Sequence, residues 1–226
     1  MTDPIVTGST WGTVMAQSIL VVDDHPLCTA ALTMAAHAVD PATIVEIAAT
    51  LAEAEARVRA RRPDLILLDL MLPDVQGFTG LALMRALCPD VPVAIVSSRD
   101  EDGTVRKARG LGAGGFISKT SPIDRMIAAL RLLLAGGQWF PDASLADGVA
   151  SEDAAAAERI GSLSVAQLRV LRAIADGAGN KQIAGDLDLA IPTIKSHLAA
   201  IFRKLDVSNR TQAVLALRAL DAEATA

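Results

Sequence analysis

Residues 64–73 read DLILLDLMLP and decide the fold of the first half of the chain. The apolar run 65–68 has the length and polarity of a strand buried on both faces, as in a parallel sheet. Asp69 follows directly, and Pro73 with the turn residues 74–77 ends the strand soon afterwards. Open α/β sheets bind ligands outside the carboxyl ends of their strands. Asp69 is therefore a candidate for chemistry, and a strand-capping Asp in a solvated loop is an equally good interpretation of this stretch alone.

A second apolar run, at residues 19–22, ends in Asp23-Asp24. If the two runs are neighbouring parallel strands, three carboxylates converge at one edge of the sheet. Like charges this close repel one another and raise pKa values unless a cation neutralises them. A hard divalent ion with oxygen ligands does so, and Mg²⁺ is the usual choice where a phosphoryl group is handled.

Two more predicted strands end at the same edge. Residues 93–96 are followed by Ser97, and residues 115–118 are followed by Lys119. The edge then holds metal-binding acids, an acceptor carboxylate, a hydroxyl and an ammonium group. This set suits a carboxylate nucleophile that attacks a phosphoryl group while the metal and the lysine stabilise charge on its oxygens.

A family resemblance rests on five motifs in this chain order: Asp23-Asp24, Asp69, Pro73, Ser97 and Lys119. The pattern resembles the receiver domain of two-component response regulators and covers roughly residues 18–135. The resemblance implies phosphotransfer from a histidine kinase onto Asp69, with Ser97 and Lys119 in the catalytic set. It also implies Mg²⁺ held by Asp23, Asp24, Asp69 and the backbone carbonyl of Met71.

The resemblance further assigns a switch pair to this receiver. Ser97 is the expected hydroxyl that follows the phosphoryl group, and it is an allowed variant of the commoner Thr. Phe116 matches the aromatic switch position. Phosphorylation is expected to draw Ser97 inward and to let Phe116 become buried.

The length fits one large domain or two small ones, and the composition favours a reduced, cytoplasmic setting. The 226 residues include two cysteines, Cys28 and Cys88, which are too few for a disulfide scaffold and read as small apolar residues. No apolar run is long enough to span a membrane, so no membrane partner is expected. Residues 1–17 lack the basic start of a secretory signal and read as a leader.

The order of elements predicts an α/β fold with a doubly wound, five-stranded parallel sheet. A helix is expected over residues 26–38, with Leu27, Ala31 and Met34 facing inward. The predicted organisation is a receiver at 17–137, a linker at 138–159 and a small all-α helix-turn-helix domain at 160–226. The distribution of charge supports two modules. From Glu158 onward the chain has nine Lys and Arg and seven Asp and Glu, whereas the part before Glu158 has 12 Lys and Arg and 19 Asp and Glu.

The second module contains four predicted helices between Leu163 and Leu220. A short helix at 181–187, a tight turn and a longer helix at 191–204 describe a helix-turn-helix, whose second helix enters the DNA major groove. The longer helix carries a clear apolar stripe, which ends at Leu205.

The residues of this module resemble the C-terminal domain of LuxR-type regulators. The matching text is NKQIA at 180–184, TIKSH at 193–197, and RKL at 203–205 followed by Asn209-Arg210. The whole chain thus resembles a NarL/LuxR-type (NarL/FixJ) response regulator that binds double-stranded DNA and forms a homodimer when phosphorylated. The implied DNA-binding residues are Lys195 and Ser196 in the groove, and Lys181, Thr193, Arg203, Lys204 and Arg210 near phosphates.

Some residues depart from the LuxR pattern. Ala166-Gln167 stands where Arg-Glu is usual, and Ala190 stands where Ser or Thr normally caps the recognition helix. A missing cap typically costs about 1 kcal/mol, so this helix end is expected to be looser. A solvated helix face is the alternative interpretation of Lys195 and Arg203.

These motifs are compatible with three functions. The first is a transcription factor controlled by phosphorylation of Asp69, which is not an enzyme. The second is a phosphatase that uses Asp69 as nucleophile, against which Met71 stands where such enzymes place a general acid. The third is a DNA-binding regulator whose receiver-like domain serves only for dimerisation. His25, beside the acidic pair, either tunes the pocket or lies in a solvated loop, and the loop is the better-supported alternative.

Overall fold

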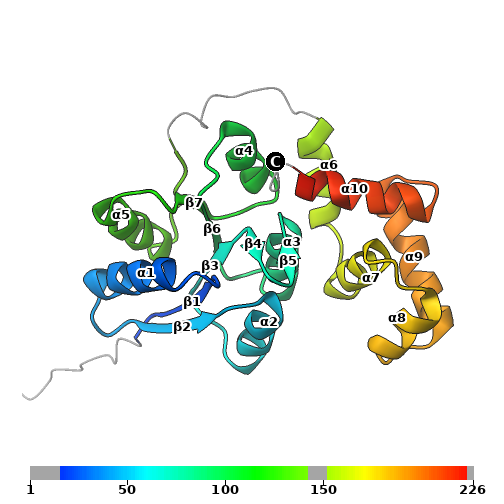
Figure 1. The fold of residues 1–226 in the computed structure, drawn as a ribbon, viewed down its shortest axis with the longest axis horizontal. Coiled ribbons are helices and arrows are strands. Elements are labelled where there is room, and N and C mark those ends of the chain that lie inside the picture. Colours follow the sequence, from blue (N-terminus) through cyan, green and yellow to red (C-terminus); the bar gives the residue numbers. More distant parts are fainter. Residues whose placement is uncertain (1–15, 142–151, 223–226) are drawn as a thin grey trace, which may run out of the picture.

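The computed structural model describes residues 16–141 and 152–222, and the predicted five-stranded α/β fold is confirmed (Figure 1). The sheet is parallel, with strand order β2-β1-β3-β6-β7. Its strands are β1 (Ser18–Val22), β2 (Ile44–Ala48), β3 (Leu65–Asp69), β6 (Val93–Ser97) and β7 (Gly115–Ser118). The runs that were expected to be neighbours are neighbours, because β1 pairs with β3 and Val22 lies opposite Leu68.

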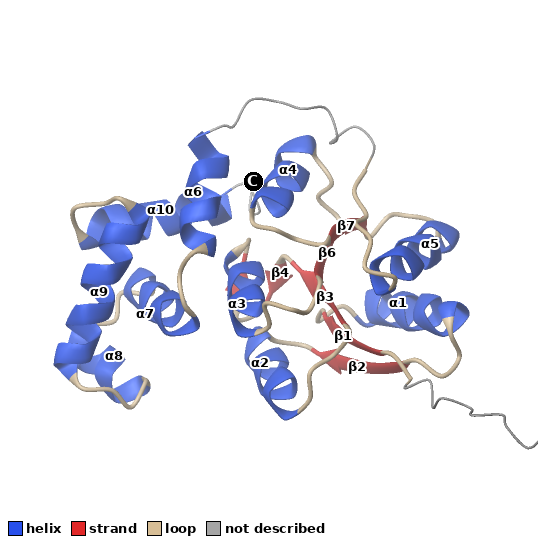
Figure 2. Cartoon of the chain, turned by 180° about the vertical axis from the view of Figure 1, so that it is seen from behind, coloured by secondary structure: helices blue, strands red, loops and turns tan. Residues whose placement is uncertain are grey.

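Helices cover both faces of the sheet (Figure 2). Val21 and Leu67 pack with α1 (Pro26–Val39) and α5 (Ile123–Leu134) on one face. Val22 and Leu68 point to the other face, which is covered by α2 (Leu51–Ala60), α3 (Thr79–Leu87) and α4 (Asp102–Gly110). Successive residues of a strand point to opposite faces, so a strand buried on both sides needs the continuous apolar run that residues 65–68 supply.

The inward face predicted for α1 is wrong. Leu27 and Met34 are 89% and 67% exposed, whereas Leu32, Ala35 and Ala36 are buried. Leu32 and the small side chains of Ala35 and Ala36 pack in the core on this face of the sheet, and Leu27 and Met34 are left in water. Helical spacing alone does not tell which of two mixed faces is buried.

A short hairpin not foreseen from the sequence joins β3 to α3. It consists of β4 (Met71–Leu72) and β5 (Val75–Gln76), which pair antiparallel. The hairpin closes at Gly77, whose φ is +72° and whose N–H donates to the carbonyl of Leu70 at 2.7 Å. Asp69 is thereby linked to the start of α3 by a compact hairpin.

The C-terminal half is all helical, as predicted. Its helices are α6 (Glu152–Gly161), α7 (Val165–Ala175), α8 (Asn180–Asp186), α9 (Ile191–Leu205) and α10 (Arg210–Ala222). Helix α6 falls largely within the expected linker, and its residues Ala157 and Ile160 are buried. The leader residues 1–15 and the linker residues 142–151 lie outside the described part. Because these residues are not described, the domain limits 17–137, 138–159 and 160–226 stay a proposal.

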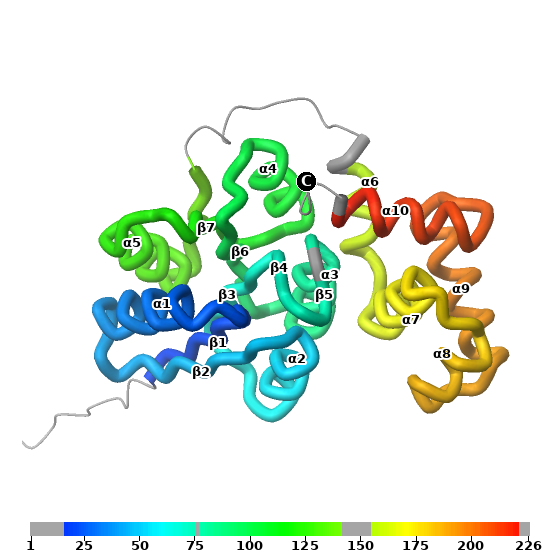
Figure 3. Tube along the Cα trace, in the orientation of Figure 1, coloured from blue at the N-terminus to red at the C-terminus, as the bar shows by residue number. Residues whose placement is uncertain are grey.

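The two halves share one apolar core. Ile160 and Leu163 belong to the same buried cluster as Phe78 and Val105 of the first half. Helices α6 and α7 and the end of α10 lie beside α3 and α4 (Figure 3). Over residues 16–141 and 152–222, no helix has the length and apolarity needed to cross a bilayer.

Candidate functional site

The four predicted strand ends converge at the carboxyl edge of the sheet. Asp23 follows β1, Asp69 ends β3, Ser97 ends β6 and Lys119 follows β7. The side chains of Asp23, Asp69 and Ser97 are buried. The Lys119 ammonium donates to Asp69 Oδ2 at 2.7 Å and lies 2.8 Å from Asp23 Oδ2. One ammonium group thus lies between two buried carboxylates.

Burial and the shared lysine determine the proton affinities of this cluster. Burial raises the pKa of Asp69 above its ordinary value, and the hydrogen bond from Lys119 only partly offsets it. Burial also acts to raise the pKa of Asp23, but its interactions with Cys28, Lys119 and the His25 N–H outweigh this effect and the pKa is lowered. Burial acts to lower the pKa of Lys119, yet its two carboxylate partners raise it overall. Lys119 is therefore held as a cation.

The residues at this edge fit a divalent cation. Carboxylate oxygens of Asp23, Asp24 and Asp69 and His25 Nδ1 all lie within 4.8 Å of one another. Asp23 Oδ2 is buried and has no hydrogen-bond donor among the described residues, since Lys119 is near it but not in hydrogen-bonding geometry. A buried carboxylate oxygen without a donor is costly, and a hard cation coordinated by oxygen removes that cost.

Two further residues, His25 and Cys28, contact the acidic pair more closely than the sequence indicated. His25 Nδ1 lies 2.9 Å from both Asp23 Oδ1 and Asp24 Oδ1, although its side chain is 60% exposed, which favours the pocket-tuning alternative. Cys28, read as a small apolar residue, hydrogen-bonds through its side chain to Asp23, and burial raises the pKa of its thiol to about 12. Its place in the first turn of α1, just after the acidic pair, was the available signal.

The expected switch residues already lie inside the protein. Phe116 is fully buried in the core, and the buried Ser97 Oγ accepts a hydrogen bond from Arg99 N–H at 3.1 Å. Phe116 is therefore already buried without phosphorylation, contrary to the expectation that phosphorylation buries it. The Met71 N–H donates to the Asp69 carboxylate, which places Met71 directly beside the acceptor.

The predicted recognition helix is α9, and its outer surface is open to solvent. Lys195, Ser196 and Arg203 are exposed along it, as is Lys181 on α8, while Thr193 is half-buried. The buried residues of α9, Ile194, Ile201 and Leu205, form the opposite stripe. This pattern gives α9 one face for the core and one polar face for a partner.

Two cations assigned to DNA phosphates have partners within the chain. Lys204 Nζ donates to the Ser162 carbonyl at 2.7 Å and to Gln167 Oε1 at 3.0 Å. Arg210 donates to the carbonyls of Ile174 and Ala178, near the end of α7. Both side chains therefore have a structural role in joining these helices.

The departures from the LuxR pattern have opposite structural outcomes. Ser164 and Gln167 form a complete capping box at the start of α7, so Gln167 takes the place of the usual acid. Helix α9 begins after Ala190 with no side-chain cap, as the sequence indicated. The start of the recognition helix therefore leaves backbone N–H groups to solvent or to a ligand.

A buried acid–lysine pocket on a five-stranded parallel sheet, followed by a helix-turn-helix, defines a receiver joined to a DNA-binding domain. Models of two families match the chain: the response regulator receiver domain over residues 19–131, and the luxR family of bacterial regulatory proteins over residues 161–217. The chain belongs to the two-component response regulators with a LuxR-type DNA-binding domain, the NarL/FixJ group. This is a family of transcription regulators and not of enzymes.

Relatives match along nearly the whole length. The Glycerol metabolism activator of Pseudomonas putida is 38% identical over 211 residues, which are 90% of this chain and 96% of that protein. Response regulator protein VraR of Staphylococcus aureus is 29% identical over 201 residues, 89% of this chain and 96% of its own. A solved structure of RcsB from Salmonella enterica serovar Typhimurium, bound to a promoter with the phosphomimetic BeF₃⁻, has a TM-score of 0.50 and 19% identity, and covers 89% of this chain and 97% of its own. At that identity the likeness concerns the fold alone.

Proposed function

We propose that Asp69 accepts a phosphoryl group from a sensor histidine kinase and that this modification controls DNA binding by the C-terminal half. The observation that carries the proposal is the buried Asp69 carboxylate, held 2.7 Å from the Lys119 ammonium beside a second buried acid. A carboxylate fixed at a strand end has its oxygen placed for attack. The fixed ammonium group lies where charge develops on the phosphoryl oxygens.

In the transfer step, an Asp69 oxygen forms the new O–P bond while the P–N bond of the donor phosphohistidine breaks. The electron pair of that bond remains on the imidazole nitrogen of the donor. Lys119 stays protonated and stabilises the phosphoryl oxygens, and the Ser97 hydroxyl donates to one of them. Asp23, Asp24 and Asp69 would hold Mg²⁺, which would supply the additional positive charge that two buried carboxylates and a phosphoryl group require.

The test is intact-mass measurement after incubation with acetyl phosphate and Mg²⁺. Wild type gains the mass of one phosphoryl group, and Asp69→Ala gains none. Asp64→Asn is a matched control, because Asp64 lies next to the opposite end of β3, where it accepts hydrogen bonds from Ser18. Absence of a mass gain in wild type overturns the proposal and favours the alternative, a receiver used only for dimerisation.

The proposed output is binding of double-stranded DNA through α9 by a homodimer, in the cytoplasm, where a kinase and promoter DNA are both accessible. Support comes from the exposed Lys195 and Ser196 on the recognition helix, and from the promoter-bound state of the related RcsB structure. Lys195 is assigned to the major groove. Lys181, Thr193 and Arg203 are assigned to the backbone phosphates.

Salt dependence separates these roles. With an operator obtained by in vitro selection, Arg203→Ala is expected to reduce the slope of log K against log salt by about one, whereas Lys195→Ala costs about 1–3 kcal/mol and relaxes specificity. Arg62→Ala is the control, since this exposed arginine lies outside the C-terminal half. Equal effects of all three substitutions would contradict the assignment.

A further inference from the structure

His25 stands at the start of α1 but does not cap it. It is the N-cap residue of that helix, with φ and ψ of −90° and 109°, and its side chain makes no cap hydrogen bond. N-cap side chains ordinarily turn back to accept from the N–H groups of the first helical turn. The imidazole instead faces the carboxyl edge of the sheet, where Nδ1 lies 2.9 Å from Asp23 Oδ1 and 2.9 Å from Asp24 Oδ1. The ring is thus directed into the acidic pocket and away from its own helix.

Hydrogen bonding explains only part of this placement. Asp23 Oδ1 already accepts from the backbone N–H of His25 at 2.9 Å. A ring nitrogen carries at most one hydrogen, so Nδ1 cannot donate fully to both carboxylates that it faces. The oxygen that lacks a donor among the described residues is a different atom, Asp23 Oδ2, and the side chain of Asp23 is only 1% exposed. The imidazole therefore leaves the main polar deficit of the pocket in place.

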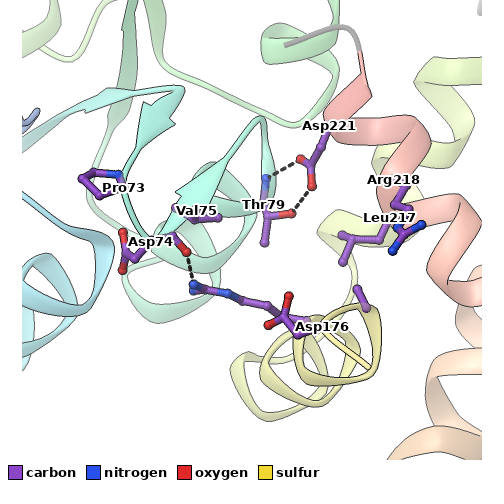
Figure 4. Close-up of a pocket in the computed structure, with 10 residues that line it drawn as sticks. Pro73, Asp74, Val75, Thr79, Asp176, Leu217, Arg218 and Asp221 are labelled. Carbon is purple, nitrogen blue, oxygen red and sulfur yellow. Dashed lines mark hydrogen bonds between the residues drawn. The ribbon is translucent and has the colours of Figure 1, made fainter. Parts of the chain in front are cut away.

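Asp221 of α10 shows what a carboxylate satisfied within the chain looks like. Its Oδ1 accepts from the backbone N–H groups of Phe78 and Thr79 at 2.8 and 3.2 Å, and its Oδ2 accepts from the Thr79 hydroxyl at 2.9 Å (Figure 4). Both oxygens have donors, so this site at the interface between the receiver and α10 has no need of a cation. Asp23 has a donor for one oxygen, and a bound cation would satisfy the other.

The spacing of the ligand atoms matches the coordination shell of a small divalent ion. Neighbouring ligands of an octahedral ion at about 2.1 Å lie about 3.0 Å apart, and opposite ligands lie about 4.2 Å apart. His25 Nδ1 is 2.9 Å from one oxygen of each acid of the pair, and 3.7 Å from Asp69 Oδ2. All four ligand atoms lie within 4.8 Å of one another. One nitrogen and three carboxylate oxygens can therefore surround a single ion after small movements.

The donor set determines which ion fits best. Mg²⁺ prefers oxygen ligands alone, whereas imidazole suits Zn²⁺ and other late first-row divalent ions. Zinc binds both imidazole nitrogen and carboxylate oxygen at about 2.0–2.2 Å. The two positive charges of such an ion, with the Lys119 ammonium, also balance the three carboxylates. A nitrogen ligand therefore adds affinity for zinc and adds none for magnesium.

We propose that His25 Nδ1 is a metal ligand of this pocket, and that the pocket consequently binds a borderline divalent ion such as Zn²⁺ more tightly than Mg²⁺. The inference rests on the proposed function for the role of the pocket, and it deepens that function by naming the class of cation beside Asp69. Mg²⁺ in excess would still bind through the three carboxylates. Its affinity would owe nothing to the imidazole.

The test compares full-length wild type with His25→Asn. The amide nitrogen of Asn can take a position close to that of Nδ1, so the variant keeps a hydrogen-bond donor but offers no ring nitrogen to a metal. Asn is also a favourable N-cap residue, so the start of α1 is preserved. His37→Asn is the matched control, because His37 is an exposed histidine in the last turn of the same helix.

Calorimetric titrations with Zn²⁺ and, separately, with Mg²⁺ give the two affinities. Wild type and His37→Asn are expected to bind Zn²⁺ at least about tenfold more tightly than Mg²⁺. His25→Asn is expected to lose about 10- to 100-fold in zinc affinity and to keep its magnesium affinity. Long-range ¹H–¹⁵N correlation spectra of the histidine rings give a direct readout. Added Zn²⁺ should move His25 Nδ1 to the shift of a metal-bound nitrogen.

Equal zinc affinity in wild type and His25→Asn overturns the inference, and loss of binding in Cys28→Ser would then assign the ion to the neighbouring thiol. A metal-bound shift on another histidine ring also overturns it, as does tighter binding of Mg²⁺ than of Zn²⁺ by wild type.

Incubation of wild type with acetyl phosphate and Mg²⁺ separates this failure from failure of the proposed function. If wild type gains the mass of a phosphoryl group but zinc affinity does not depend on His25, only the metal inference is wrong. If zinc affinity depends on His25 but wild type gains no mass, only phosphorylation of Asp69 is wrong.

Discussion

The protein contains two acid–lysine arrangements that differ in how completely their hydrogen-bonding groups are satisfied: one in the receiver pocket, and one at the interface between the receiver and α10. In the pocket, Lys119 lies between the buried carboxylates of Asp69 and Asp23, and Asp23 Oδ2 has no hydrogen-bond donor among the described residues. At the interface, Asp221 accepts three hydrogen bonds and Lys107 donates to two carbonyls. The pocket has excess negative charge, whereas the interface satisfies its charges within the chain.

This difference indicates what each region does. A buried carboxylate oxygen without a donor is costly, so the pocket gains free energy from a cation that coordinates it. An interface whose charges are already paired gains nothing from a ligand and loses much when one partner is removed. The pocket is suited to binding a cation, whereas the interface requires no ligand.

The largest expected effect separates the two lysines. Lys119→Met should lower the rate of phosphorylation by acetyl phosphate about 100-fold, because it removes the fixed charge beside the phosphoryl oxygens. Lys107→Met should not lower that rate. Intact mass against time measures both, and a similar fall in the two variants would show that the lysines do not have separate roles.

Metal binding distinguishes the acids of the pocket from Asp221 at the interface. Mg²⁺ at 100 times its dissociation constant should raise the free energy of unfolding by about 2.7 kcal/mol, since it binds only the folded pocket. Chemical denaturation with and without Mg²⁺ measures this gain. Asp23→Asn should lose most of it and Asp221→Asn should keep it. A full gain in Asp23→Asn would exclude Asp23 as a ligand.

Two helix N-termini of the C-terminal half also differ in how completely their backbone N–H groups are satisfied. Helix α7 has a complete capping box from Ser164 and Gln167, whereas α9 has no side-chain cap at Ala190. Ala190→Ser should stabilise the protein by up to about 1 kcal/mol, and Ser164→Ala should destabilise it by about the same amount. Thermal unfolding followed by circular dichroism tests this, and a destabilised Ala190→Ser would mean that the start of α9 cannot accept a cap.

The smallest expected effect is a pH dependence of the docking of α10 on the receiver. Burial raises the pKa of Asp221 above 3.8 in the docked state, partly opposed by the hydrogen bonds from Thr79 and Phe78, whereas a solvated carboxyl keeps its ordinary value. The docked state therefore binds the proton more tightly. Its favourable contribution is complete below the ordinary pKa and is lost as pH rises through the raised value.

Lowering the pH from about 7 toward about 5 should accordingly favour docking of α10 on the receiver slightly. The charged groups around Asp221 are Lys107 on α4, Arg218 on α10, Arg172 and Asp176 on α7, and Asp74 in the hairpin. Asp221→Asn leaves all of them in place and removes the titration. Hydrogen-exchange protection factors of the Phe78 and Thr79 amides across this range should show the pH effect in wild type alone, and an equal effect in Asp221→Asn would assign it to other groups.

Much of the pocket was predictable from local sequence. Each acid, the hydroxyl and the lysine follow an apolar run, and parallel strands bring their carboxyl ends to one edge. The sequence offered contact of His25 with the pocket as one of two alternatives. The interaction of Cys28 with Asp23 was not predictable in this way, because it depends on how α1 turns after Asp24. The inward face of α1 was predicted wrongly, because Leu27 and Met34 are left in water where small residues make the contact.

The sequence by itself determined the alternation of strands and helices, the acidic edge and the helix-turn-helix, since these depend on periodicity and on residues near one another in the chain. Only the tertiary structure decided that Asp221 caps α3, that Lys107 caps α10, and that Lys204 and Arg210 bind carbonyls of neighbouring helices. A free N–H or carbonyl at a helix end is satisfied by any group that packing brings within about 3 Å. Sequence separation sets no limit on that choice, so no local pattern contains it.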